Sequence, residues 1–128
     1  MTKTKIVAEI GCNHKGDLEI AKKMIFTAKN FCDAEIIKFQ KRNNKVLLSD
    51  EYDKPHPIPE NSYGKSYGLH RDFLEFNIKQ HKELKEYCKK LGVVYSCSVW
   101  DIVSCQEICK IKPRFIKIPS AKNLDFEK

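Results

Sequence analysis

Short apolar runs alternate with segments of helical periodicity along the whole chain, and this alternation restricts the fold more than any other feature. The apolar runs are rich in β-branched and aromatic residues and lie at residues 5–10, 35–39, 93–97 and 115–118. The second run contains the adjacent pair Ile36 and Ile37, which suits a strand covered on both faces. Four strands joined by helices predict an α/β fold with a parallel sheet and right-handed crossovers.

Capping residues mark where three helices begin. Asp17 and Asp101 are suited to N-cap positions, and Asn77 with Gln80 has the spacing of a capping box. Gly92 suits the end of the helix that begins near Asn77. We therefore expect helices after the first strand, before the third strand and before the fourth.

Two arrangements are compatible with this order: an open doubly wound sheet, or part of a (β/α)8 TIM barrel. No G-x-G-x-x-G follows the first strand, so a dinucleotide-binding fold has no support. In both arrangements, functional side chains lie at the carboxyl ends of the strands.

Residues 41–76 interrupt the alternation. Pro55, Pro57 and Pro59 fall in this stretch among glycines, serines and charges of both signs. A loop of this length in a compact domain is usually functional or mobile. We expect a long loop from which Arg71 contacts a ligand or a partner subunit, with a solvated surface insertion as the alternative.

Composition excludes several classes of protein. The net charge is +7, but the lysines are scattered along helices, which argues against nucleic-acid binding and weakly favours a small anionic substrate. No apolar run is long enough to span a bilayer and the N-terminus has no signal-peptide core, so we expect a cytoplasmic location without membrane contact.

The six cysteines form no C-x-x-C pair and are expected to be reduced core thiols. Cys105 and Cys109 share a helix face, but no nearby histidine completes a metal site.

Polar and charged side chains gather at all four expected strand ends. These are Glu9, Asn13 and His14 after the first strand, Lys38 and Gln40 on the second, Ser96, Cys97 and Ser98 on the third, and Lys117 and Ser120 on the fourth. Lysines beside small hydroxyl groups can hold a phosphate or carboxylate. A carboxylate opposite them can accept hydrogen bonds from sugar hydroxyls or transfer a proton.

Other interpretations stay open at this point. A single strand lysine can pair with a neighbouring acid. Lys38 or Lys117 could instead form a Schiff base with a carbonyl substrate, as in aldolases. His14 could contact a ligand or simply order its glycine-containing loop.

The motifs AEIGCNHKGDLEIAKKMI, IIKFQKR, YGLHRDFLEF, YSCSVWD and IKIPSA, in this order, resemble the sialic acid synthase (NeuB-like) family. The resemblance runs from about Ile6 to Ala121. It implies a (β/α)8 barrel and a reaction that condenses phosphoenolpyruvate with an N-acetylated amino sugar, such as N-acetylmannosamine, to give N-acetylneuraminate and phosphate. Legionaminic or pseudaminic acid synthesis is the nearest alternative.

The resemblance also implies roles for individual residues. Glu9 contacts the acceptor sugar, Lys38 and Lys117 bind phosphoenolpyruvate, and Ser120 binds its phosphate. Cys97 stands where the family often has a phosphate-contacting threonine, and Ser96 or Ser98 is expected to compensate. The family uses Mn²⁺ or Mg²⁺ to polarise the sugar aldehyde, with ligands on later strands that this chain lacks, so no metal ligand is assigned here.

Length is the main departure from the family. A full barrel needs about 250 residues, whereas this chain has 128. We therefore expect residues 1–128 to be the N-terminal half of such a barrel, without the remaining strands and the C-terminal antifreeze-like domain, inactive alone and homodimeric when complete. A non-catalytic half-barrel that binds anions or sugars is the alternative.

Overall fold

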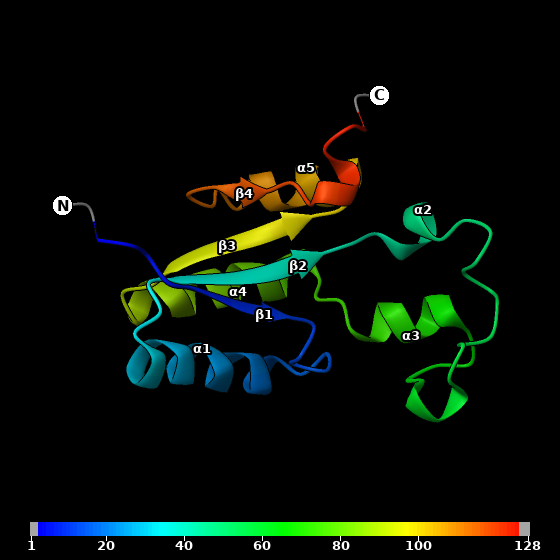
Figure 1. Cartoon of the computed structure of the whole chain (residues 1–128), viewed down its shortest axis with the longest axis horizontal. Helices are drawn as coiled ribbons and strands as arrows, with labels where there is room; N and C mark the ends of the chain where they lie inside the picture. The colour runs from blue at the N-terminus through cyan, green and yellow to red at the C-terminus, as the bar shows by residue number, and fades with distance from the viewer. Residues whose placement is uncertain (1–2, 126–128) are drawn as a thin grey trace.

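Four strands lie side by side in chain order in one parallel sheet, with the order β1-β2-β3-β4 (Figure 1). Residues 3–125 are described by the structure, which is a computed structural model. The strands are β1 (Val7–Gly11), β2 (Ile36–Lys41), β3 (Val94–Val99) and β4 (Ile116–Lys117). This confirms the parallel sheet that the alternation predicts.

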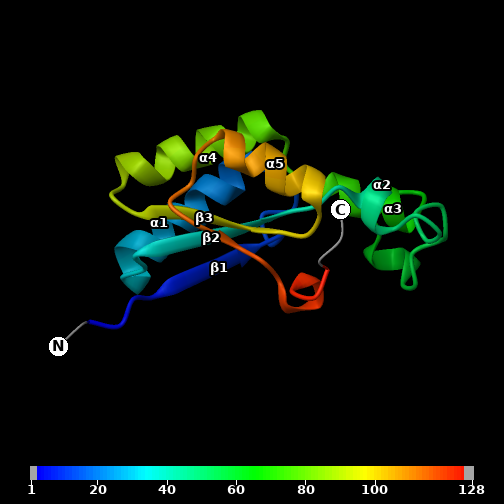
Figure 2. The same cartoon turned by 90° about the horizontal axis from the view of Figure 1, so that it is seen from above.

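The three main helices cover the same face of the sheet (Figure 2). They are α1 (Leu18–Cys32), α4 (Ile78–Lys90) and α5 (Ile102–Lys110). Among residues 3–125, the opposite face carries the short 3-10 helix η2 (Ser120–Lys122), which follows β4, and none of the three main helices. Doubly wound sheets have helices on both faces, whereas consecutive barrel strands have them on one face. The arrangement is therefore that of successive strands in a (β/α)8 barrel.

The predicted capping residues begin the helices. Asp17 accepts hydrogen bonds from the backbone N–H groups of Glu19 and Ile20 at 2.8 and 3.0 Å. Asn77 and Gln80 exchange side-chain-to-backbone hydrogen bonds at 3.0 and 2.9 Å, which completes the capping box. Gly92 follows α4 with a φ of +71°, a conformation that glycine adopts without strain.

The second and third strands extend beyond their predicted ends, to Lys41 and Val99. Polar residues near these ends, such as Gln40 and Ser98, made the strands look shorter in the sequence. Pairing nevertheless continues, since Gln40 lies opposite Ser98 in the register. The fourth strand is shorter than predicted, with two paired residues.

The stretch 41–76 is more ordered than a loop and lies beyond the carboxyl ends of the strands (Figure 1). It contains α2 (Asn44–Leu47), η1 (Pro59–Asn61) and α3 (Tyr67–Phe73). Asn44 donates to Asp72 at 2.9 Å, and the backbone N–H of Gly68 donates to the carbonyl of Tyr52 at 2.8 Å. These bonds fix α2 and the following chain against α3.

The hydrophobic core fills the space between the sheet and its three helices. Phe39 on β2, Ile25 on α1, Leu84 on α4 and Ile108 on α5 are completely buried. The ring of Phe39 stacks on that of Tyr95 with centroids 6.0 Å apart. Phe39 is therefore the central side chain that joins β2 and β3 to the helical layer.

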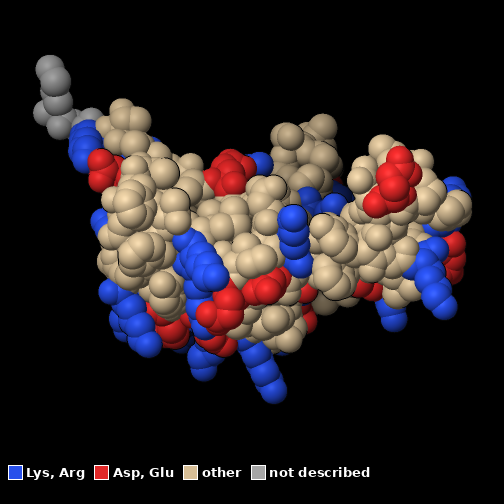
Figure 3. Space-filling view, turned by 90° about the horizontal axis from the view of Figure 1, so that it is seen from below, with Lys and Arg blue, Asp and Glu red and all other residues tan. Residues whose placement is uncertain are grey.

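The surface view shows lysine and arginine side chains dispersed among acidic ones on the face displayed (Figure 3). Between residues 3 and 125, every helix is too short or too polar to cross a bilayer. All six cysteines are free, and only Cys88 and Cys97 are buried. The expectation of core thiols therefore does not extend to Cys32 and Cys109, which are exposed.

Candidate functional site

Side chains alternate between the two faces of each strand, and this parity defines the site. On β2, Ile37 and Phe39 point toward the helices and are fully buried in the core. Their neighbours Lys38 and Gln40 therefore point to the face without helices. We call this face, which a closed barrel would enclose, the open face.

Strand register places the predicted site residues of the open face in two adjacent rows. In the first row, Glu9 on β1 lies opposite Lys38 on β2, which lies opposite Ser96 on β3. The second row, nearer the carboxyl ends, consists of Gln40, Ser98 and Lys117. The structure thus brings six of the predicted residues from four strands onto one surface.

Glu9 and Lys38 form an ion pair across β1 and β2. The Lys38 Nζ donates to Glu9 Oε1 over 2.7 Å. The lysine side chain is 11% exposed and the glutamate side chain 66% exposed. The ammonium is thus held in place at the bottom of the open face, while its carboxylate partner remains accessible to a ligand.

The two serines of β3 differ in how free they are. Ser96 is fully buried, and its hydroxyl donates to the carbonyl of Phe115 at 3.3 Å. This bond links β3 to the residue before β4, so the hydroxyl hydrogen of Ser96 already has an acceptor within the protein. Ser98 is almost as buried, at 4% exposed, but it lies beside Lys117 in the second row, nearer the carboxyl ends of the strands, and is therefore the better candidate to contact a ligand.

Cys97 does not face the ligand side, which corrects the expectation that it contacts phosphate. It alternates with Ser96 and Ser98, is completely buried, and belongs to the core cluster on the helical side. Burial raises the pKa of its thiol to about 12. The same parity places the hydroxyl groups of Ser96 and Ser98 on the open face. Of the two serines expected to compensate for the Cys97 thiol, Ser98 is the better candidate.

His14 is buried within its own loop, which favours the loop-ordering interpretation over contact with a ligand. It is 2% exposed, and its ring stacks on Phe76 with centroids 4.0 Å apart. Its Nδ1 accepts a hydrogen bond from the backbone N–H of Gly16 at 3.1 Å. Burial lowers its pKa from 6.5 to about 4, so the ring stays neutral and orders the loop between β1 and α1.

The remaining predicted residues lie around the rim. Asn13 is exposed and donates to the carbonyl of Ile10 at 2.9 Å, so it also stabilises its own turn. Ser120 is exposed in η2, three residues after Lys117. Arg71 is half-buried on α3, outside the two rows. The structure does not bring Arg71 together with the residues of the open face.

Arg42 is a residue of this region that the sequence reasoning missed. Its guanidinium donates to the side-chain oxygen of Gln40 and to Cys12 Sγ at 3.6 Å, and lies 4.4 Å from the centre of the Trp100 ring. Glu75 accepts the Arg42 backbone N–H at 3.0 Å and forms an ion pair with the guanidinium at 3.6 Å. The spacing was the available signal, since Lys38, Gln40 and Arg42 recur at period two.

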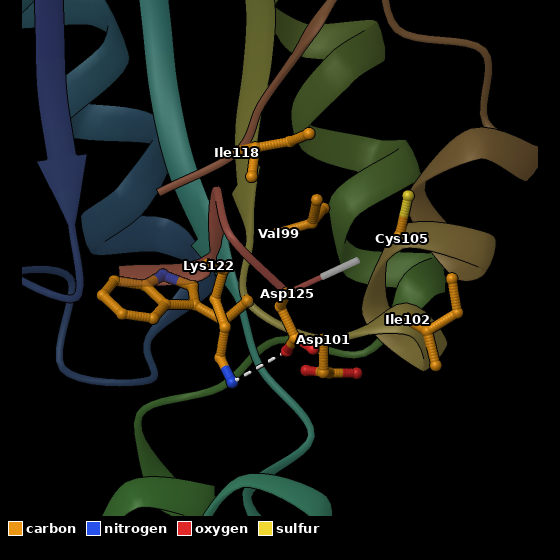
Figure 4. A pocket seen from close by; sticks show the side chains of 8 residues that line it. Val99, Asp101, Ile102, Cys105, Ile118, Lys122 and Asp125 are labelled. Atoms are coloured by element: carbon orange, nitrogen blue, oxygen red, sulfur yellow. Dashed lines mark hydrogen bonds and ion pairs between the residues drawn. The ribbon is translucent and has the colours of Figure 1, made fainter. Parts of the chain in front are cut away.

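A separate cavity of about 170 Å³ lies where β3 leads into α5 (Figure 4). Val99, Ile102 and Ile118 contribute apolar walls, and Lys122 pairs with Asp125 at 3.3 Å. Its other acid, Asp101, caps α5 through Ser104 and accepts from the Asn43 backbone. Its charged groups are already paired, and no residue of the two rows lines it, so it is a poor site for an anion.

No cluster of three or more histidine, cysteine, aspartate or glutamate side chains in residues 3–125 could hold a metal ion. Glu9 is the carboxylate of the two rows, and Lys38 already neutralises it. The described residues therefore do not fit the divalent cation that the family resemblance implies.

Comparisons with known proteins agree with this geometry. The family model described as NeuB matches residues 24–128. The chain is 37% identical to the N-acetylneuraminate-9-phosphate synthase of Mus musculus, over 94% of this chain and 33% of that protein. It is 34% identical to the N,N'-diacetyllegionaminic acid synthase of Campylobacter jejuni, over 95% of this chain and 36% of that protein. The chain thus spans about a third of the length of these curated relatives.

Solved structures support the same fold. A sialic acid synthetase from Leptospira borgpetersenii in complex with citrate matches with a TM-score of 0.74 and 26% identity, over 94% of this chain and 38% of that one. A spore coat polysaccharide biosynthesis protein E from Chromobacterium violaceum matches with a TM-score of 0.78 and 20% identity, over 97% and 36%. The sheet is thus the N-terminal part of a TIM barrel, and because the family model covers most of its length, the chain belongs to the NeuB family.

Proposed function

We propose that this chain supplies the N-terminal part of a nonulosonic acid synthase, which condenses phosphoenolpyruvate with an N-acetylated amino sugar and releases phosphate. N-acetylmannosamine, giving N-acetylneuraminate, is the first candidate for the acceptor. The names of the relatives, which include synthases of N-acetylneuraminate 9-phosphate and of N,N'-diacetyllegionaminic acid, keep a phosphorylated or a diacetylated acceptor as alternatives.

One observation carries this proposal: the two rows of donors on the open face. Lys38 and Lys117 come from different strands, and Ser98 and Gln40 lie between them in the register. Two ammonium groups and short neutral donors suit a small anion with a carboxylate and a phosphate. Glu9 belongs to the first row, and its exposed carboxylate can accept hydrogen bonds from sugar hydroxyls.

In this proposal, phosphoenolpyruvate binds across the rows and the sugar lies above it, toward Glu9. The methylene carbon of phosphoenolpyruvate forms a bond to the aldehyde carbon of the open-chain sugar, and the aldehyde oxygen gains a proton. Water adds to the adjacent carbon, and phosphate leaves with the oxygen of the cleaved C–O bond. Lys38 and Lys117 stabilise the negative charge of the bound phosphoenolpyruvate and of the departing phosphate.

The ion pair between Lys38 and Glu9 bears on whether Lys38 binds an anion or forms a Schiff base. A protonated, paired lysine attracts an anion but is a poor nucleophile, because its lone pair is occupied by the proton. The 2.7 Å bond therefore favours anion binding by Lys38 over a Schiff base with a carbonyl. Sodium borohydride in the presence of pyruvate tests this, since a Schiff base leaves a covalent adduct and a bound anion does not.

Phosphoenolpyruvate binding by the chain is the direct test. We expect titration of the ¹⁵N-labelled chain to shift resonances of β2, β3 and β4. The K38M and K117M variants should weaken binding about tenfold or more, because each removes a charge-assisted contact. K110M, at the exposed end of α5, is the matched control and should bind as the unaltered chain does. Equal losses in all three variants would mean that net charge, not the open face, attracts the ligand.

Catalysis needs a second experiment, because the chain spans only about a third of its relatives. We expect no phosphate release by the chain alone with phosphoenolpyruvate and N-acetylmannosamine. Adding the part of the mouse relative that this chain does not match should produce release if the two pieces assemble. Binding without release in every mixture would favour a non-catalytic anion-binding half-barrel. Turnover by residues 1–128 alone would contradict the expectation that this piece is inactive.

A further inference from the structure

Arg42 lies just past the end of β2 and is held on several sides. Its side chain is 13% exposed. The guanidinium lies against the Trp100 ring, contacts Cys12 Sγ and pairs with Glu75, whose own side chain is 9% exposed. These contacts come from three separate segments of the chain, so the orientation of the guanidinium is strongly constrained.

The contact between Arg42 and Gln40 determines where the oxygen and the nitrogen of the Gln40 carboxamide lie. A guanidinium has only donors, so the atom that it contacts must be the Gln40 oxygen, Oε1. The Nε2 then lies on the other side, near Gly11 of β1. A Cβ atom added at Gly11 would lie 3.5 Å from this nitrogen. The amide N–H groups of Gln40 are thus presented toward β1 on the open face.

We propose that Arg42 is a positioning residue, which holds Gln40 so that its Nε2 donates a hydrogen bond to an oxygen of the anionic substrate. This inference rests on the proposed function, because it takes phosphoenolpyruvate as the anion. Gln40 shares its row with Ser98 and Lys117, so its N–H lies beside a hydroxyl and an ammonium group. Without Arg42, the carboxamide could rotate and present its oxygen, which repels an anion.

Arg42 itself does not bind the anion in this arrangement. Its charge is balanced by Glu75, and one face of the guanidinium is covered by Trp100. Glu75 is buried, and burial raises its pKa while the Arg42 backbone N–H and charge lower it. The Arg42–Glu75 ion pair therefore orients the neutral Gln40 carboxamide without adding net charge to the open face.

The orientation of Gln40 can be measured without any ligand, from the side-chain ¹⁵NH₂ resonances of the labelled chain, assigned by their loss in Q40A. We expect R42M to shift or average the two Gln40 amide protons, because the oxygen loses its donor. R42K should restore part of the separation, since a lysine can donate one hydrogen bond to the same oxygen. R114M is the matched control, because Arg114 is exposed and precedes β4 at the other end of the strands.

Titration with phosphoenolpyruvate is the second readout. We expect R42M to bind about tenfold more weakly and R42K to fall between R42M and the unaltered chain. Q40E keeps an acceptor for Arg42 but loses the donor, and should bind more weakly still. A dispersed backbone spectrum shows which variants fold. If R42M does not fold, the comparison of R42K with the unaltered chain tests the positioning role.

Unchanged Gln40 resonances and unchanged affinity in R42M and R42K would overturn the positioning role. If the unaltered chain does not bind phosphoenolpyruvate, the proposed function fails. In that case the ligand-free Gln40 resonances still show whether Arg42 orients the carboxamide, so the two failures are distinguishable.

Discussion

Lys38 Nζ donates a hydrogen bond to Glu9 Oε1 over 2.7 Å, from a lysine side chain that is 11% exposed to a glutamate side chain that is 66% exposed. The two residues lie opposite each other on β1 and β2. Glu9 is therefore both the ion-pair partner of Lys38 and the negative group that an incoming anion must approach.

The variant E9Q separates these two effects. Glutamine can still accept the Lys38 hydrogen bond but carries no charge, so repulsion of the anion is removed. We expect phosphoenolpyruvate to bind up to about fivefold more tightly, as the loss of a partly exposed charge interaction allows. Isothermal titration calorimetry checks this, with E19Q as the control because Glu19 pairs with Lys22 on the surface of α1. Weaker binding by E9Q would mean that the Glu9 charge supports the anion site.

Neighbouring positions on β3 provide a test of side-chain parity. C97S places a hydroxyl in a fully buried site, so we expect the free energy of unfolding to fall by about 1–3 kcal/mol. Its affinity for phosphoenolpyruvate should not change. S98A should do the reverse, with little change in stability and several-fold weaker binding. Urea unfolding and ligand titration of both variants give the comparison, and weaker binding by C97S would return Cys97 to the site.

Much of this site was predictable from the sequence because strand parity needs only local information. Lys38 and Gln40 are separated by one residue, between the apolar residues Ile37 and Phe39, so their common face follows directly. On β3 the run of Ser96, Cys97 and Ser98 has no such contrast in polarity. The signal for Cys97 was its period-two relation to the apolar Tyr95 and Val99.

Contacts between segments that are distant in the sequence could not be predicted from local sequence patterns. His14 is buried because Phe76, more than sixty residues later, stacks on its ring. Arg42 is held by Glu75 from the link between α3 and α4 and by Trp100 after β3. No local pattern specifies these partners, because they depend on how 41–76 folds beyond the strand ends. The helices α2 and α3 were missed for the same reason.

Two glycines with similar backbone angles provide a matched test of the packing between this stretch and the β1–α1 loop. Gly16 and Gly92 have φ values of +74° and +71°. A Cβ at Gly16 would lie 2.2 Å from the carbonyl oxygen of Phe73, whereas one at Gly92 would meet nothing within 4 Å. We expect G92A to cost about 1 kcal/mol from its backbone angle alone. G16A should cost at least about 1 kcal/mol more, since α3 must also move.

Urea unfolding of the two variants measures this difference. Their ¹⁵N spectra should also differ, because G16A should shift resonances of α3 while G92A should affect only the end of α4. Equal losses of stability, with no change at α3, would show that the carbonyl of Phe73 does not pack against the β1–α1 loop as described.

Two buried histidines should make the chain sensitive to acid. His81 is completely buried and bonds to the Tyr95 hydroxyl at 2.8 Å, and burial lowers its pKa from 6.5 to about 3. Burial similarly lowers the pKa of His14 to about 4. Below pH 6.5 the unfolded chain binds protons that the folded chain excludes, so stability falls as the pH falls. Each histidine should remove about 2 kcal/mol between pH 7 and pH 5.

Glu75 acts in the opposite direction, because burial raises its pKa above 4.5. Above this value the unfolded chain releases a proton that the folded chain retains, so Glu75 lowers stability as the pH rises through this range.

The contribution of His81 is isolated by comparing how the stability of two proteins changes with pH. The double variant H81L/Y95F removes the His81 ring and its hydroxyl partner together, while Glu75 and His14 remain. We expect the stability of this variant, measured by urea unfolding at pH 7 and pH 5, to fall by about 2 kcal/mol less than that of the unaltered chain. An equal fall in both proteins would show that His81 does not titrate with a lowered pKa in the folded state.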